Sequence, residues 1–351
     1  MNRDELLELI HNGEIAQDAS CAGLDLSGAD LSGGIFERVS FASCNLAGAT
    51  LAESLFSNCD FSGATLSQAS LHITRMVDCT LSATALSSAY LATAAFIRCD
   101  LSGADFSAAN MTMAKLVECN ASQARFTGAN LDRAAILQSQ LPGAEFREAM
   151  LKQTAILETD LSGSGLAGAI CANAIFVKSK LAGLALTNMR LAATQFIGAD
   201  LSGVDFSGSD LTQCNFKDAI LDGAVLRGCA AGNTLFPNAR LHGAVLEGAA
   251  LQQAIFIEAD LGGADLSRAN LYQAQFTKAV CRGARFQSAE LTYCDFSHAD
   301  LSEADFTGAK LFRAVLHRAR EEKTVWKDSS RDLALGTDPE LAEAEDWGRR
   351  A

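Results

Sequence analysis

The chain has 351 residues, with 42 acidic and 28 basic side chains and a formal net charge of −14. No basic stripe interleaved with aromatic residues interrupts this acidic balance, which argues against direct binding of nucleic acid. No stretch approaches eighteen consecutive apolar residues, which argues against a transmembrane helix. We therefore expect a protein of the cytoplasm that binds neither nucleic acid nor a membrane.

Residues 1–18 are predicted to form a helical cap at the amino-terminal end. Asn2 is followed three positions later by Glu5, which is the spacing of a capping box, and the apolar Leu6 comes next. Gly13 can end this helix. The segment lacks the apolar core of a signal peptide, so we expect no secretory leader.

Residues 19–320 are predicted to form a solenoid, because an apolar residue returns every five positions from Cys21 to Leu316 without an insertion or deletion. A small residue stands two positions before each of these central residues, as Ala199 stands before Leu201. Residues two apart on an extended backbone share a face, but the next inward pair begins three residues later. The chain must therefore turn after every pair, and four sides of five residues would close a coil of twenty.

Segments such as Ala29-Asp30-Leu31-Ser32-Gly33 and Ala199-Asp200-Leu201-Ser202-Gly203 resemble the A-(D/N)-L-x-x unit of pentapeptide repeat proteins. The resemblance covers about 300 residues of the chain. It implies an all-β solenoid, a right-handed quadrilateral β-helix of about fifteen coils, with short helical caps at both ends. The central and small residues would fill its interior.

Residues twenty apart are expected to stack above one another in the core. Leu31 and Leu201 are examples of central residues, and one column is largely phenylalanine. Offset stacking of the rings explains this column, and an aromatic stripe that binds a ligand is the alternative. Its members are Phe36, Phe56, Phe96, Phe176, Phe196, Phe216, Phe236, Phe256, Phe276 and Phe296.

The residue types that perform chemistry do not form a recognisable catalytic or metal-binding pattern. All eleven cysteines fall on inward slots, where they would pack as small, reduced hydrophobic residues, and no C-x-x-C pair is present. The five histidines are scattered. The sequence therefore predicts no catalytic residue, no metal site and no cofactor, and we expect a protein that is not an enzyme.

Residues 321–351 are predicted to form a carboxyl-terminal cap with a short helix. Glu321 is the first charged residue in a central slot, and Trp326 then returns to the repeat frame. A helix is expected to start around Asp338, with proline at its first position. Three apolar residues of this segment are candidates for binding a partner or forming a homodimer, namely Trp326, Leu341 and Trp347.

Six aspartates would fall on one column, in the position just before the central residue. A carboxylate there can accept hydrogen bonds from turn amides, which is a structural role, and the alternative is that the column binds a partner. These residues are Asp60, Asp100, Asp160, Asp200, Asp260 and Asp300.

Two classes of function follow from resemblance rather than from spacing. Segments at the two ends, Leu6 to Glu14 and Val315 to Glu322, look like those of pentapeptide repeat proteins associated with bacterial type VI secretion. This implies a scaffold or adaptor whose partner is a secretion effector, spike or adaptor protein. Other members of the family mimic duplex DNA and bind gyrase or topoisomerase, and this chain is similar to them in having a rod and a final helix. It departs from them in bearing many surface bases, such as Lys178 and Arg282.

Overall fold

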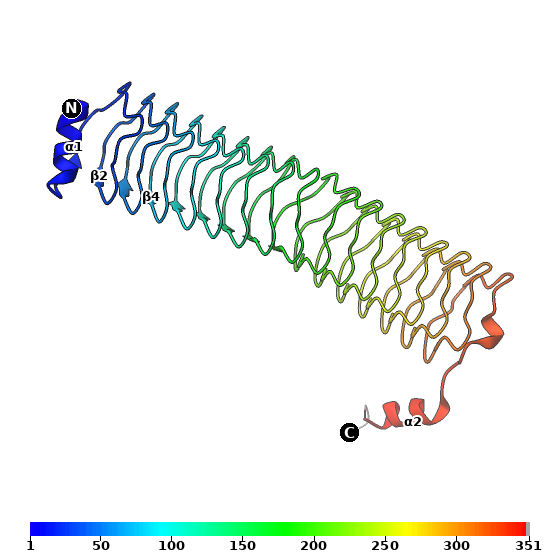
Figure 1. Ribbon diagram of the computed structural model, residues 1–351. Coiled ribbons are helices and arrows are strands. Elements are labelled where there is room, and N and C mark those ends of the chain that lie inside the picture. Colours follow the sequence, from blue (N-terminus) through cyan, green and yellow to red (C-terminus); the bar gives the residue numbers. More distant parts are fainter. Residues whose placement is uncertain (349–351) are drawn as a thin grey trace. The chain divides into compact units, whose positions relative to one another are not determined.

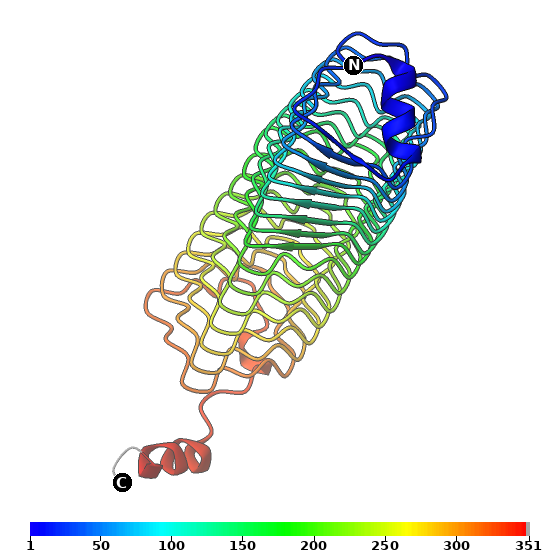
Figure 2. The ribbon, with the colours of Figure 1, turned by 90° about the vertical axis from the view of Figure 1, so that its left-hand side faces the viewer.

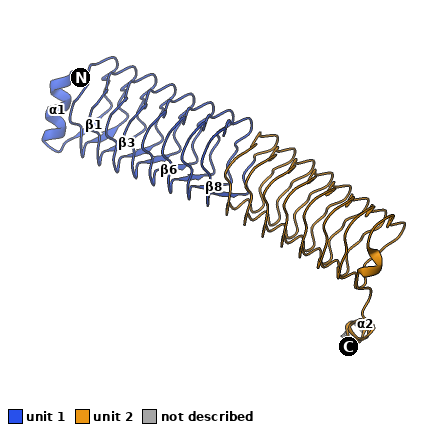
Figure 3. Ribbon diagram, turned by 45° about the vertical axis from the view of Figure 1, so that its right-hand side comes forward, with its two compact units in different colours: residues 1–180 blue, residues 181–351 orange. Residues whose placement is uncertain are grey.

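The computed structural model describes residues 1–348, and the chain divides into two compact units, residues 1–180 and residues 181–351 (Figure 3). Each unit is a stack of coils, and each side of a coil has five residues. The domain boundaries expected from the sequence remain predictions. Strand pairing nevertheless begins at Ile15 and continues to Leu335, so it extends into both predicted caps.

The first unit contains one helix and one parallel sheet. The helix α1 (Arg3–His11) precedes nine short strands, which pair in chain order, and each residue pairs with the residue twenty positions later (Figure 1). The strands are β1 (Ile15–Gln17), β2 (Ile35–Glu37), β3 (Leu55–Ser57), β4 (Arg75–Val77), β5 (Ala95–Ile97), β6 (Lys115–Val117), β7 (Ala135–Leu137), β8 (Ala155–Leu157) and β9 (Ile175–Val177).

The second unit keeps the twenty-residue register with less extended backbone. Its coils pair through isolated parallel bridges, from Ala185 with Asp205 to Val315 with Leu335. It adds a single turn of 3-10 helix, η1 (Arg331–Leu333), and the helix α2 (Pro339–Gly348). The all-β solenoid with a short helix near each end is therefore confirmed. The expected fifteen equivalent coils are not matched by the sheet, which has nine strands and ends at Val177.

The core follows the predicted pattern. Leu31 and Leu201 are fully buried, as are the predicted phenylalanines, whose exposure is at most 1%. In the second unit, Phe256 stacks on Phe236 and Phe276 with ring centroids 4.7 and 4.8 Å apart. Each Phe thus fills the coil and contacts its neighbours, which supports the structural interpretation of the column.

The side of the coils whose central residues lie every twenty positions from Ala16 to Leu316 is called the phenylalanine face below. In the second unit its turns are closed, because the N–H of Ala259 donates to the carbonyl of Phe256 over 3.1 Å. In the first unit the sheet lies on this face, and side chains take part in the bonding. The hydroxyl of Ser179, for example, accepts from the N–H of Thr159 and donates to the carbonyl of Ile156. Turns of this kind, which lack the backbone hydrogen bond, are called open turns below. They leave three extended residues per coil, whereas the closed turns do not.

The two ends are covered in different ways. At the start, Asn2 and Glu5 form the predicted capping box of α1, and Leu6 is completely buried. At the other end, Glu321 pairs with Arg331 over 3.0 Å, which compensates the charge in that central slot. Neither helix among residues 1–348 combines the length and hydrophobicity needed to cross a bilayer.

Candidate partner-binding site

The helix α2 starts where the sequence predicts. The Asp338 carboxylate accepts hydrogen bonds from the N–H groups of Glu340 and Leu341, over 2.9 and 3.1 Å, which satisfies two of the free donors at the helix start. Pro339 occupies the first helical position, where its missing N–H costs nothing. The helix is therefore capped by its own sequence.

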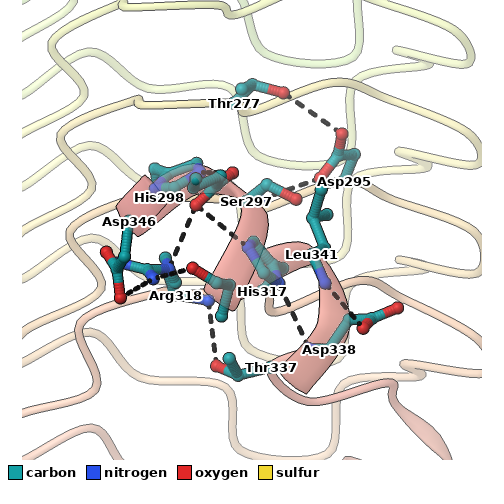
Figure 4. A network of polar contacts seen from close by, with 12 residues as sticks. Thr277, Asp295, Ser297, His298, His317, Arg318, Thr337, Asp338, Leu341 and Asp346 are labelled. Carbon is teal, nitrogen blue, oxygen red and sulfur yellow. Dashed lines mark hydrogen bonds and ion pairs between the residues drawn. The ribbon is translucent and has the colours of Figure 1, made fainter. Parts of the chain in front are cut away.

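Charged side chains attach α2 to the coils beneath it (Figure 4). Glu345 lies 3.0 Å from His298 Nε2 and 3.4 Å from His317 Nε2, and it also forms an ion pair of 3.0 Å with Arg318 Nε. Arg318 continues to the Asp346 carboxylate over 2.8 Å. These residues come from two consecutive coils and from α2, and sequence reasoning missed their convergence because it listed the histidines as scattered.

The network shifts the titration of the Glu345 carboxyl. Burial opposes its ionisation, but the hydrogen bonds from His298 and His317 outweigh this effect, so the pKa of Glu345 lies below its ordinary value. The Asp346 carboxylate in turn raises the pKa of Arg318. At neutral pH the helix is therefore attached through a carboxylate and a guanidinium that are both charged.

His298, His317 and Glu345 also place three possible metal ligands within 4.8 Å of one another. The second ring nitrogen of His317 argues against this use. Its Nδ1 accepts the backbone N–H of Asp338 over 3.1 Å, so the proton of the neutral ring lies on Nε2, which faces Glu345. Histidines that bind metal normally donate from the other nitrogen, and this one accepts. The geometry therefore fits a hydrogen-bonded contact that attaches α2 to the coils better than it fits a metal site.

A groove of about 760 Å³ lies beside α2. It combines apolar side chains with the polar start of the helix. Its lining residues are Ser297, Val315, His317, Leu335, Gly336, Asp338, Pro339, Glu340 and Leu341. Leu341, one of the predicted binding residues, is half exposed here.

The three predicted carboxyl-terminal binding residues do not share one role. Trp326 stacks on Phe306 with ring centroids 4.4 Å apart, and the Arg331 guanidinium covers it at 5.2 Å. It thus continues a core column and closes the last coil. Trp347 is 78% exposed, whereas Leu341, one turn before Glu345 on the groove side of α2, is 49% exposed. The exposed apolar surface is therefore carried by the helix and not by Trp326.

The six predicted aspartates adopt one local geometry. One carboxylate oxygen of each accepts the backbone N–H of the residue two positions later, over 2.9 to 3.1 Å, and the bond from Ser202 to Asp200 is an example. Within each unit, basic residues interrupt the acidic column. Lys180 pairs with Asp160 in the first unit and Arg320 with Asp300 in the second. The observed contacts support the structural role, and partner binding by these aspartates remains a prediction.

A second surface feature, which is half-buried, was missed by sequence reasoning. On the outer side of the sheet, the residue after the centre is aliphatic in six consecutive coils. A search for apolar residues outside the core slots at a spacing of twenty could have found it. The six are Val77, Ile97, Val117, Leu137, Leu157 and Val177.

Parallel coils with an apolar interior and a repeat of five residues define the chain as a β-solenoid repeat protein. Family models agree: a pentapeptide repeat region matches residues 90–166, and pentapeptide repeats match residues 35–72 and five overlapping stretches within 190–318. Together these matches cover more than half of the chain. The chain belongs to the pentapeptide repeat family, which confirms the resemblance seen in the sequence.

Solved structures of the family are also similar to this chain. Full-length QnrB1, a plasmid-mediated fluoroquinolone resistance protein, is 23% identical, with 68% of this chain and 91% of that chain covered and a TM-score of 0.34. HetL, involved in heterocyst differentiation regulation in the cyanobacterium Nostoc sp. strain PCC 7120, is 20% identical over 96% of this chain and 98% of its own, with a TM-score of 0.14. A thylakoid lumen protein of Arabidopsis thaliana is 29% identical over 42% and 75%, with a TM-score of 0.16. No curated protein sequence matches the chain.

Proposed function

We propose that this protein is a non-catalytic scaffold of the bacterial cytoplasm that binds another protein at the exposed side of α2. The observation that carries the proposal is the exposed apolar surface of this attached helix. Glu345 and Asp346 hold α2 to the coils, yet Leu341, which lines the groove, and Trp347 are 49% and 78% exposed. Large apolar side chains next to a groove are typical anchors of protein interfaces.

The partner that we propose is an effector, spike or adaptor protein of type VI secretion. The resemblance of the terminal segments to the secretion-associated members supports this choice. A homodimer through the carboxyl-terminal region would bury the same Leu341 and Trp347, so we assign this surface to a different protein. The hydroxyls of the repeat that contact a carboxylate, such as Ser62 with Asp60, belong to a turn motif repeated along the chain, so the proposed role is positioning rather than catalysis.

The alternative is mimicry of duplex DNA toward gyrase or topoisomerase. The formal charge of −14 favours it. The distribution of charge does not, because Arg240 in the second unit lies between Asp200 and Asp260 along one ladder and pairs with Asp222 over 2.6 Å. A duplex presents uninterrupted negative charge, and this ladder does not.

Direct binding to purified components tests the proposal. The full chain is immobilised and exposed in turn to the secretion effectors, spike and adaptor proteins of its own host, and to gyrase. We expect one secretion component to bind, and we expect the double substitution Leu341→Ser and Trp347→Ser to weaken it by about 30-fold or more, as loss of an interface anchor does. Phe312→Ser, at a 46% exposed residue away from α2, is the matched control. Binding of gyrase alone, or binding that the double variant leaves unchanged, would overturn the proposal.

A further inference from the structure

The outer side of the sheet in the first unit is the strongest feature that the proposed function does not use. In each strand the central residue points inward and its two neighbours point outward. Because the strands pair in register, the neighbours form two columns on the surface, as Figure 2 shows for the stacked strands. The column after the centre is the aliphatic one, Val77, Ile97, Val117, Leu137, Leu157 and Val177, which we call the aliphatic strip.

The column before the centre widens this strip. It is apolar in four of the same six coils, with Ala95, Ala135, Ala155 and Ile175, and charged in two, with Arg75 and Lys115. All ten apolar residues of the two columns retain solvent exposure. At about 4.8 Å per strand, the six coils from β4 to β9 make a surface about 24 Å long.

Within the first unit this surface has no cover. The helix α1 packs against β1, at the start of the sheet, and not over β4 to β9. Scattered apolar residues are ordinary on a protein surface, but a contiguous flat patch of this kind marks an interaction site. A sheet face buries such a patch most simply against another flat sheet face, with the two about 10 Å apart.

Charges along the two edges of the aliphatic strip indicate which second sheet can pack against it. The edge before the centre carries Arg75 and Lys115. The opposite edge, two residues after the centre, carries Asp78, Glu118 and Glu158, together with Arg98, which pairs with Asp78 over 2.7 Å, and Lys178. One edge therefore carries only basic charge, and the other carries three acids and two bases, with Asp78 and Glu118 at the levels of Arg75 and Lys115.

Such a face is complementary to itself under one orientation. A two-fold axis parallel to the stack of coils brings the basic edge of one copy to the acidic edge of the other. Lys115 then faces Glu118 of the second copy, and Arg75 faces Asp78. A two-fold axis along the strands would instead place acidic edge on acidic edge, which costs energy. We propose that the aliphatic strip is a self-association surface, on which a second copy of this chain packs sheet to sheet around a two-fold axis parallel to the coils.

The mass of the full chain in solution tests the proposal. Sedimentation velocity over a concentration series should show a dimer whose affinity falls by about 100-fold or more in Leu137→Asp, because a carboxylate would be buried at the centre of the interface. Ile257→Asp is the matched control, since Ile257 occupies the equivalent slot in the second unit and is also half-buried, and it should leave the affinity unchanged. Circular dichroism confirms that both variants fold.

Charge exchange tests the orientation without touching the apolar strip. Lys115→Glu should weaken the dimer by about ten-fold, and adding Glu118→Lys should restore it, because the two edges then exchange signs together. A parallel axis also places each strip residue opposite its own counterpart. Ile97→Cys and Leu157→Cys should therefore each form a cross-link between two copies, whereas Ile257→Cys should not.

Three results would overturn the proposal. The first is a wild-type chain that stays monomeric up to its solubility limit. The second is a dimer that Leu341→Asp on α2 dissociates and Leu137→Asp does not, which would assign the contact to the carboxyl-terminal helix. The third is a monomer that captures a different purified protein through the strip, with that binding lost in Leu137→Asp.

Discussion

The phenylalanine face is built in two ways, and in most coils the difference accompanies a change of residue in a single slot. In the slot two residues before the central residue of the next side, the first unit carries Cys, Ser or Thr in seven consecutive coils, from Cys59 to Ser179, after Ala19 and Val39 in its first two coils. The second unit carries alanine there in every coil from Ala199 to Ala319. The first unit forms strands on this face and the second forms closed turns. Both units bury phenylalanine or another large apolar residue in the central slot beside it.

Hydrogen-bonding capacity contributes to the difference. A hydroxyl can accept the N–H that would otherwise close the turn, as Ser139 does for Cys119 over 3.1 Å, and it donates to a carbonyl at the same time. Alanine can do neither. In the alanine coils the backbone must satisfy its own groups, so the N–H of Ala219 donates to the carbonyl of Phe216. This slot does not decide alone whether the outer surface is a flat sheet, because β1 and β2 form with Ala19 and Val39 in it, but in the six coils of the aliphatic strip the hydroxyl or thiol accompanies the sheet.

The largest expected effect tests the dependence of the second unit on ring stacking. Phe256 is fully buried between two parallel rings, so Phe256→Ala should leave a cavity and cost about 3–5 kcal/mol of unfolding free energy. Urea unfolding followed by circular dichroism measures this loss. Phe312→Ala, at an exposed position, should change it by less than about 0.5 kcal/mol. If Phe256→Ala cost less than about 1 kcal/mol, ring stacking would not be what stabilises this face.

A smaller effect tests the hydroxyl network of the first unit. Thr159 donates to the carbonyl of Leu157 over 2.9 Å and is 1% exposed. Thr159→Ala should cost about 1–2 kcal/mol, because it leaves a buried carbonyl and the N–H of Ser139 with poorer partners. Thr159→Ser keeps the hydroxyl and should restore most of the loss. Equal stability of the Ala and Ser variants would show that the turn can close as it does in the second unit.

The two end helices also differ in how they are attached, and acid should loosen only one of them. The buried side chain of Leu6 attaches α1 to its unit by an apolar contact, whereas α2 is attached through Glu345, His298, His317 and Arg318. The pKa of Glu345 is depressed in the folded protein, so its stabilising contribution is present above pH 4.5 and is lost as the pH falls through the lower folded value. Hydrogen exchange of the α2 amides should therefore accelerate in that range while the α1 amides stay protected. Glu345→Gln should produce the same acceleration at neutral pH.

If the α2 amides of Glu345→Gln exchange as slowly as those of the wild type, contacts beside the groove hold the helix in place, and the charge network does not. A matched control is Glu343→Gln, since Glu343 lies on the exposed side of the same helix. It should leave exchange unchanged at every pH.

The sequence predicted the repetitive part of the fold because the signal was summed over sixty slots. The five-residue period, the inward cysteines, the start of α1 at Asn2 and the start of α2 at Asp338 all express local rules that a single segment contains. The nine-stranded sheet was not predicted. One contributor, the change from Cys, Ser and Thr to alanine in one slot, was visible in the sequence, but its consequence depends on hydrogen bonds between coils.

The candidate sites were harder to predict for the same reason. The aspartates of the repeat could be given their turn-capping role from spacing alone. His298 and Glu345 are 47 residues apart, and no repeat relates α2 to the coils, so their contact had to be seen in the structure. Trp326 differs from Leu341 and Trp347, because it returns to the repeat frame and stacks on Phe306, and partner binding by all three residues remains a prediction.

The smallest expected effect concerns the cysteines, for which the two units should behave alike. All eleven are buried, with seven in the first unit and four in the second. Burial raises the pKa of Cys171 in the first unit and of Cys214 in the second to about 12, so both thiols stay protonated at pH 9, where an exposed thiol is already largely reactive. Hydrogen bonds from neighbouring thiols lower the pKa of Cys59 and Cys99, but burial keeps reagent away from every cysteine. Alkylation of the native chain at pH 9 should therefore label none of the cysteines, and alkylation in denaturant should label all of them, as mass spectrometry would show. Selective labelling of the column from Cys59 to Cys119 in the native protein would contradict this expectation. It would mean that the open turns of the first unit admit the alkylating reagent and that the closed turns of the second unit do not. Hydrogen bonds of hydroxyls and thiols between coils would then protect the core less well than backbone turns do.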